Sequence, residues 1–262
     1  MKLPFFQVDA FADRPFAGNP AAVIPLEAWL DADVMQAIAE ENNLSETAFT
    51  VPAAGDADYE LRWFTPTTEV ALCGHATMAS GHVLIRGDGD VRFRTRKAGM
   101  LVVRRDGDRL SLDLPVTKVR EGEHGGLLDA LGTPGATVFN SYSGAEATSI
   151  VLLDSAEAVR ACTPDMRALR DIELMVIVTA RGDGEQDVVS RVFVPAWGVD
   201  EDPVTGSAHA ALALFWAERL GRASFTAYQA SRRGGVVDCR LSGDRAILSG
   251  RCVTVIEGSF IL

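Results

Sequence analysis

Two short segments of the chain place glycine and small side chains at the start of an apolar stretch. The first is Cys73-Gly74-His75-Ala76-Thr77 and the second is Thr205-Gly206-Ser207-Ala208-His209. The apolar run after each is long enough for a helix, so each segment would form a helix N-terminus. The first backbone N–H groups of a helix lack partners within it, and the helix dipole favours an anion there. Two such ends facing one another would hold a carboxylate and stabilise negative charge developing beside it.

Three titratable side chains could move a proton beside such a carboxylate. Glu46 begins an apolar strand, and a carboxyl group in apolar surroundings suits a group that takes and returns a proton. His75 lies at the first helix N-terminus, where the dipole should depress its pKa and keep the ring neutral. Asp202 belongs to a carboxylate cluster, residues 200–202, before the second helix. The residues alone leave open an ordinary structural reading of each: an exposed glutamate, a structural histidine and dipole-complementing carboxylates.

The chain repeats itself once. Arg62–Pro66 is echoed by Arg191–Pro195, 129 residues later, and Gly74-His75-Ala76 is echoed by Gly206-Ser207-Ala208, 132 residues later. Upstream, Met35–Ile38 matches Met166–Leu169 at an offset of 131. Matches in the same order at nearly the same offset indicate two similar α+β halves. We expect an N-terminal lobe over 1–117, to which the last strand could return, and a C-terminal lobe over 118–262, with the site in a cleft between them.

The hydrophobic pattern predicts the elements that position these residues. Alternating and apolar runs predict strands at 5–11, 21–25, 47–51, 59–64, 91–96, 110–114, 149–153, 174–179 and 188–194. Helical spacing predicts helices at 32–41, 74–85, 164–170 and 206–220. Asp31 is expected to cap the first of these helices, and Gly221 is expected to end the last.

Composition excludes several classes of function. The 262-residue chain is 47% hydrophobic and 23% charged, with a formal net charge of −11. Such an acidic surface repels phosphate backbones and anionic lipid, so nucleic acid and membranes are not expected partners. The four cysteines are far apart, and the N-terminus lacks the pattern of a signal peptide, which favours a cytoplasmic location. No metal site is expected: His75 and His82 are two turns apart, and Cys73 and His75 have no further ligand nearby in sequence.

Five blocks of the sequence together resemble the signature of PhzF-like proteins of the phenazine-biosynthesis family. They are Phe16–Pro20, Asn43–Phe49, Arg62–Pro66, Glu69–Thr77 and Gly198–His209, and they run through most of the chain in the family's order. The resemblance implies the diaminopimelate epimerase-like fold, an α+β fold of two pseudo-symmetric lobes, each a mixed sheet wrapped around a central helix. It also implies a cytoplasmic, cofactor-independent isomerase acting on a small carboxylate substrate, and it is compatible with a homodimer.

The resemblance further implies a role for each matching residue. Glu46 would be the acid/base that moves the proton, as in the isomerisation of trans-2,3-dihydro-3-hydroxyanthranilate. His75, Asp202 and Ser207 would be the other polar residues of the site, which orient the substrate or assist proton movement. The expected substrate-binding residues are Asn19, Cys73, Gly74 and Gly206, the two glycines through their backbone N–H groups.

Three alternatives remain from the sequence. An amino-acid epimerase of this fold uses two opposed cysteines, but Gly206 stands where a partner to Cys73 is expected. A serine hydrolase built on Ser207 lacks the usual strand-to-helix elbow, and His209 at i+2 points to another helix face. A non-catalytic binding protein on the same scaffold would tolerate Glu46→Gln, whereas an isomerase would not.

Overall fold

The computed structural model describes residues 1–143 and 146–262, which divide into two compact units. Unit 1 comprises Met1–Asp113 and Ser249–Leu262, and unit 2 comprises Leu114–Leu248. The division lies close to residue 117, where the sequence analysis placed it. It differs by assigning the last fourteen residues to unit 1 rather than to the C-terminal lobe, a return that the sequence had left open.

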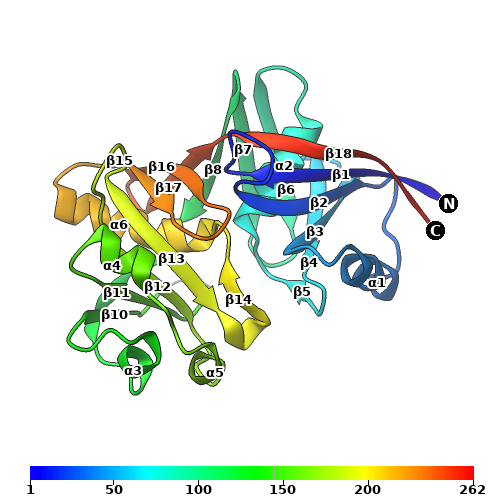
Figure 1. The fold of residues 1–262 in the computed structure, drawn as a ribbon. Coiled ribbons are helices and arrows are strands. Elements are labelled where there is room, and N and C mark those ends of the chain that lie inside the picture. The colour runs from blue at the N-terminus through cyan, green and yellow to red at the C-terminus, as the bar shows by residue number, and fades with distance from the viewer. Residues whose placement is uncertain (144–145) are drawn as a thin grey trace. The chain divides into compact units, whose positions relative to one another are not determined.

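Unit 1 is a mixed sheet around one buried helix (Figure 1). Its strands β2 and β3 run parallel, β4 is antiparallel to β3 and parallel to β6, and β7 and β8 continue antiparallel. The N-terminal β1 lies between β2 and the C-terminal β18, antiparallel to both. The elements are β1 (Lys2–Ala10), β2 (Asn19–Pro25), α1 (Ala32–Asn42), β3 (Glu46–Pro52), β4 (Tyr59–Phe64), β5 (Glu69–Val70), α2 (Gly74–Leu84), β6 (Gly89–Thr95), β7 (Met100–Asp106), β8 (Arg109–Pro115, ending in unit 2) and β18 (Cys252–Ile261).

The central helix of unit 1, α2, is buried over most of its length and packs against β1, β2, β3 and β7. A Cβ at Gly81 would lie 2.5 Å from Val103 Cγ1, so this glycine lets the helix approach β7 closely. Two polar side chains of the helix bond back to its own carbonyls. Thr77 Oγ1 donates to the Cys73 carbonyl at 2.5 Å, and Ser80 Oγ donates to the Ala76 carbonyl at 2.8 Å. The helix is thereby compatible with an apolar surrounding on all sides.

Unit 2 repeats this arrangement. Strands β11 and β12 run parallel, β13 is antiparallel to β12 and parallel to β15, and β16 is antiparallel to β15. Helix α6 is the counterpart of α2 and is also largely buried. The elements are β9 (Val119–Gly122), α3 (Leu127–Leu131), β10 (Thr137–Ser141), β11 (Thr148–Leu152), α4 (Ala156–Ala161), α5 (Met166–Leu169), β12 (Met175–Arg181), β13 (Val188–Val194), η1 (Pro195–Trp197), β14 (Val199–Asp202), α6 (Gly206–Leu220), β15 (Ser224–Gln229), β16 (Gly235–Ser242) and β17 (Arg245–Gly250).

Several predicted elements match those observed. The strand over 188–194 and the helix over 206–220 have the predicted bounds, and Gly221 ends α6 with a φ of 66°. Asp31 occupies the N-cap position of α1, but its side chain makes no capping hydrogen bond, so the predicted cap is wrong. Among the described residues, no helix combines the length and apolar character needed to cross a membrane.

Candidate active site

Three elements of unit 1, the strands β2 and β3 and the helix α2, begin at the same end of its sheet. Because β2 and β3 are parallel with Ala21 opposite Glu46, Asn19 at the start of β2 lies near the start of β3. Helix α2 packs against both strands, and its first turn carries His75. The site therefore follows from topology: parallel strands bring their starting residues together, and the helix N-terminus points to that end.

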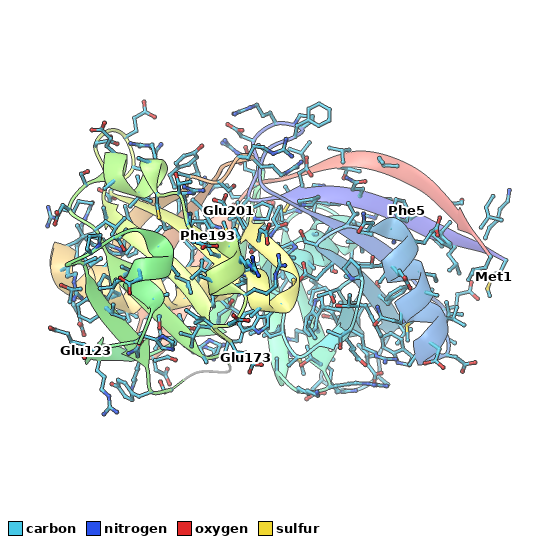
Figure 2. All side chains as sticks on the ribbon, turned by 60° about the horizontal axis from the view of Figure 1, so that its bottom comes forward. Met1, Phe5, Glu123, Glu173, Phe193 and Glu201 are labelled. Atoms are coloured by element: carbon cyan, nitrogen blue, oxygen red, sulfur yellow. The ribbon has the colours of Figure 1, made fainter. Side chains whose placement is uncertain are left out.

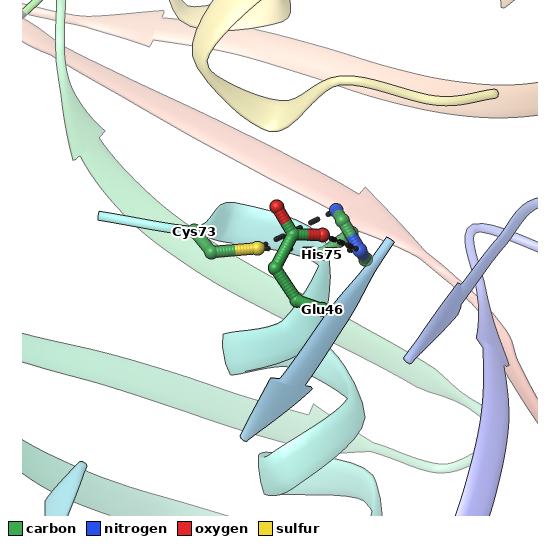
Figure 3. A group of neighbouring side chains, drawn as sticks. All are labelled: Glu46, Cys73 and His75. Atoms are coloured by element: carbon green, nitrogen blue, oxygen red, sulfur yellow. Dashed lines mark hydrogen bonds and ion pairs between the residues drawn. The ribbon is translucent and has the colours of Figure 1, made fainter. Parts of the chain in front are cut away.

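Glu46, Cys73 and His75 meet at this end of the sheet (Figure 3). The His75 Nε2 atom lies 3.0 Å from Glu46 Oε2, and the Glu46 side chain is only 17% exposed. The Cys73 Sγ atom lies 3.5 Å from His75 Nδ1 and 4.0 Å from Nε2. The amide nitrogen of buried Asn19 lies 3.1 Å from His75 Nδ1. The imidazole is thus held between an amide, a thiol and a carboxylate, which fixes its orientation.

The electrostatics of the three groups are coupled. Burial of the Cys73 thiol, together with the charge of Glu46, raises its pKa to about 11, so the thiol keeps its proton near neutral pH. Burial alone would lower the pKa of His75, but its interactions with Cys73 and Glu46 outweigh burial and raise that pKa well above 6.5. The prediction of a neutral His75 with a depressed pKa is therefore wrong. That prediction rested on the helix dipole alone and left out the neighbouring carboxylate. Because the Cys73 thiol is uncharged at neutral pH, we attribute the raised pKa of His75 to Glu46.

The loop that leads into Asn19 is held by a residue that the sequence analysis did not single out. Asp9, at the end of β1, accepts a hydrogen bond from the Phe16 backbone N–H at 2.9 Å. Phe16 adopts a φ of 69° and its side chain is 82% exposed. A positive φ at a bulky residue is uncommon and requires support from its surroundings. Asp9 supplies part of that support; its signal in the sequence was a carboxylate inside a strand of otherwise mostly apolar residues.

Unit 2 carries a different set of side chains at the corresponding positions. Ser207, like His75, is the second residue of its helix, and its hydroxyl lies 3.7 Å from the sulfur of Met175. Met175 begins β12 as Glu46 begins β3. The two strand starts are 129 residues apart, the same offset that relates Arg62–Pro66 to Arg191–Pro195.

Asp202 and Thr205 form the loop before α6. The Thr205 hydroxyl donates a hydrogen bond to Asp202 Oδ2. Buried Gln229 braces this loop: its Oε1 accepts from the Thr205 N–H at 2.9 Å, and its Nε2 donates to the Asp202 carbonyl at 2.7 Å. Gln229 was missed because no strand was predicted there, although alternation with Phe225 and Ala227 would have marked it as a polar residue on a buried face.

The structure also corrects two details of the alternatives. The N-cap residue of α6 is Thr205, so the counterpart of Cys73 is Thr205 and not Gly206. Neither Thr205 nor Gly206 is a cysteine, so the two-cysteine epimerase mechanism lacks its second thiol at this position. His209 is fully buried, and its Nδ1 lies 2.7 Å from the Thr205 carbonyl, a contact that directs this nitrogen away from a role as the base for Ser207.

An ion pair in each unit fixes the strand beside its helix N-terminus. Arg62 on β4 donates two hydrogen bonds to Glu69, both at 2.8 Å, and its guanidinium lies over the Phe64 ring at 5.0 Å. Arg191 on β13 repeats this with Glu201 at 2.7 and 3.0 Å, and lies over Phe193 at 4.9 Å. Phe193 and Glu201, labelled in Figure 2, are opposite one another on β13 and β14. The repeated sequence motif thus encodes a repeated structural clamp.

The fold and the site together define a class of protein: two repeated units of mixed sheet around a buried helix, with a carboxylate–imidazole pair at the helix N-terminus in one of them. A sequence model of the family described as phenazine biosynthesis-like protein matches residues 8–258. The chain belongs to this phenazine biosynthesis-like family.

Relatives extend over the whole chain. An uncharacterized isomerase of Pseudomonas aeruginosa is 51% identical over 263 residues, covering 98% of both chains. The human phenazine biosynthesis-like domain-containing protein is 39% identical and covers 99% of both. A crystal structure of a PhzF-family protein from Enterococcus faecalis matches with a TM-score of 0.90 and 42% identity over all of both chains.

The likeness extends more distantly to a hydroxyproline epimerase from Agrobacterium vitis, with a TM-score of 0.60 and 16% identity over 98% of this chain and 92% of that one. At that identity the match concerns the fold alone. The predicted α+β, diaminopimelate epimerase-like fold is confirmed.

Proposed function

We propose that this protein is an isomerase that moves a proton on a small carboxylate substrate, without a cofactor, and that Glu46 is the acid/base. The observation that carries the proposal is the contact between Glu46 Oε2 and His75 Nε2, at 3.0 Å and largely shielded from water. Poorly solvated carboxylates beside a hydrogen-bond donor are suited to taking a proton from carbon and returning it. The naming of relatives as isomerases supports the same reaction class.

In the proposed reaction, the Glu46 carboxylate removes a proton from a C–H group that is acidified by a neighbouring unsaturated or carbonyl group. The electron pair left behind delocalises toward that group, and the same carboxyl then returns the proton to a different carbon. His75 Nε2 forms an ion pair with Glu46 Oε2 at 3.0 Å and holds the carboxylate in place before it takes the proton. A single carboxyl that takes and returns the proton needs no second thiol, which agrees with the absence of a cysteine at Thr205.

We propose that the substrate carboxylate is anchored by backbone N–H groups at the N-terminus of α2, including that of Gly74. No side chain caps this end, and among the described residues α6 has the same property at Gly206. Asp202 and Ser207 are carried over from the family resemblance as residues that orient the substrate. Their roles, and a homodimeric state, are predictions that mutagenesis and light scattering would test.

The proposal is tested by NMR detection of deuterium uptake from solvent into a panel of small cyclic and amino-bearing carboxylates, including dihydro-hydroxyanthranilate. Wild-type protein should exchange deuterium into one class of compound, and Glu46→Gln should reduce the rate by about 10²- to 10⁴-fold. Glu41→Gln, a change at an exposed carboxylate on α1, is the matched control and should leave exchange unaltered.

Persistent exchange in Glu46→Gln would show that another group is the base. Tight binding of a panel member by both proteins, with no exchange in either, would instead identify a binding protein on this scaffold.

A further inference from the structure

The site in unit 1 brings together three different types of metal ligand. The donor atoms of Glu46, Cys73 and His75 all lie within 4.8 Å of one another. The third ligand, Glu46, is distant from Cys73 and His75 in the chain and comes from the start of β3, so the spacing of residues around Cys73 did not indicate it (Figure 3). A thiolate, an imidazole and a carboxylate together favour zinc over hard cations such as Mg²⁺.

The spacing of the donor atoms suits a tetrahedral ion. With zinc bonds of about 2.0–2.3 Å, tetrahedral angles place neighbouring donor atoms roughly 3.3–3.6 Å apart. The observed separations, 3.0 Å from His75 Nε2 to Glu46 Oε2 and 4.0 Å from His75 Nε2 to Cys73 Sγ, lie on either side of this range. The third separation, between the carboxylate of Glu46 and Cys73 Sγ, is within 4.8 Å. Side-chain shifts of up to about an ångström would therefore accommodate the ion.

The surroundings also resemble those of zinc sites. A metal-binding histidine usually has its second nitrogen held by a polar group, which fixes the ring. Here the Asn19 amide lies 3.1 Å from His75 Nδ1. Rotation of the amide would present its oxygen to an Nδ1–H while Nε2 binds the ion. Because the ligands come from the start of β3 and the first turn of α2, the backbone holds them in place before binding.

We propose that Glu46, Cys73 and His75 form a reversible Zn²⁺ site that switches off proton transfer. Binding releases two protons to solvent: the thiol proton of Cys73 as the zinc–sulfur bond forms, and the Nε2 proton of the His75 imidazolium as the zinc–nitrogen bond forms. The ion then occupies the lone pairs of the imidazole and the carboxylate. Three protein ligands leave a fourth position for water, as in other zinc sites with an open position. The inhibitory part of this inference rests on the proposed function, because it requires Glu46 to be the base; the binding part does not.

The binding part is tested with Co²⁺, a spectroscopic substitute for zinc, on chelator-treated protein without substrate. Titration of the wild type should produce a thiolate-to-cobalt charge-transfer band together with visible bands of tetrahedral cobalt, and Zn²⁺ should abolish them. Cys73→Ser should lose the charge-transfer band, and His75→Gln should weaken binding by at least about 10-fold. Cys252→Ser, which alters another thiol of unit 1, is the control and should behave as wild type.

Circular dichroism of each variant checks that it is folded. A wild type without the charge-transfer band, or a band that persists in folded Cys73→Ser, would overturn the site.

Inhibition is read separately in the deuterium-exchange assay. Zn²⁺ should stop wild-type exchange, and a chelator should restore it. Exchange that continues in protein whose cobalt bands prove occupancy would overturn the inhibitory role. If no compound exchanges at all, the proposed function fails, while the cobalt titration still decides whether the site exists.

Discussion

Units 1 and 2 share one arrangement of strands and helix but differ in chemistry where the helix begins. In unit 1 the strand start and the second helical residue are Glu46 and His75, a carboxylate and an imidazole 3.0 Å apart. In unit 2 the same positions hold Met175 and Ser207, a thioether and a hydroxyl 3.7 Å apart. Both units keep the same arrangement of strands and helix, but only unit 1 has at these two positions a carboxylate and an imidazole, which can exchange a proton with one another. Fold and function are therefore encoded by different residues.

The largest effect on deuterium exchange is expected when His75 is replaced by serine, the residue at the matching position of unit 2. His75→Ser removes the donor that orients Glu46, and we expect deuterium exchange to fall by about 10²- to 10⁴-fold. Ser207→Ala removes a hydroxyl whose described contact is a thioether, and we expect a loss nearer 10-fold, the size of one neutral hydrogen bond. Single-turnover exchange rates measure both. Equal losses would mean that unit 2 contributes as much as unit 1 to proton transfer.

The two ion-pair clamps should differ in their contribution to the free energy of unfolding. Arg62 is 4% exposed, so Glu69→Gln leaves a buried guanidinium without its counter-charge and should cost about 3–5 kcal/mol. Arg191 is 14% exposed and also donates to the carbonyls of Arg160 and Cys162. Glu201→Gln should therefore cost less, about 1.5–3 kcal/mol. Urea unfolding of both variants measures the difference, and the reverse order would contradict this account.

The buried histidine of unit 2 should make the protein sensitive to acid. Burial lowers the pKa of His209 to about 4, below its value of 6.5 in an unfolded chain. Protonation then favours the unfolded state, so the contribution of neutral His209 is complete above pH 6.5 and is lost as the pH falls toward 4. The loss is about 3 kcal/mol at pH 4. His209→Asn should remove this part of the pH dependence in unfolding experiments between pH 7 and 4; an unchanged slope would assign acid sensitivity elsewhere.

His75 should titrate in the opposite direction. Its pKa is raised, so its protonated form stabilises unit 1 fully below pH 6.5, and this contribution is lost as the pH rises through the folded-state pKa. In Glu46→Gln the main charge partner is gone and burial should lower the pKa. NMR titration of the imidazole signals in chelator-treated protein would show this. A His75 pKa that is unaffected by Glu46→Gln would mean that Glu46 does not set its charge.

Local patterns predicted much of the fold. Mostly apolar runs such as 188–194 and 206–220 gave correct bounds because most of their residues are buried, which leaves a clear pattern in the sequence. After Gly221 the sequence analysis expected only a last strand, without bounds, and the other elements went unpredicted. There the strands β16 and β18 carry polar residues, and the pairing of β18 with β1 depends on contacts across the whole chain.

The residues of the candidate site could be identified from the sequence, but the contacts between them could not be predicted. The family resemblance identified Glu46, His75 and Cys73, yet the direction of the His75 pKa shift depends on a 3.0 Å contact between residues 29 positions apart. The helix dipole, a local feature, gave the wrong sign. Asp9 and Gln229 were missed for a related reason: their importance lies in which loop they hold, and that is a property of tertiary structure.

The pairing of β18 with β1 has a consequence for synthesis on the ribosome. The last strand completes unit 1, and Leu262 donates its backbone N–H to the Met1 carbonyl at 2.9 Å, so the two chain ends lie side by side (Figure 1). Unit 2 is continuous in sequence and can fold before β18 is translated, whereas unit 1 keeps an unpaired edge until β18 emerges. Since Glu46, Cys73 and His75 all belong to unit 1, a prematurely terminated polypeptide would contain every one of these residues without the strand that closes their sheet.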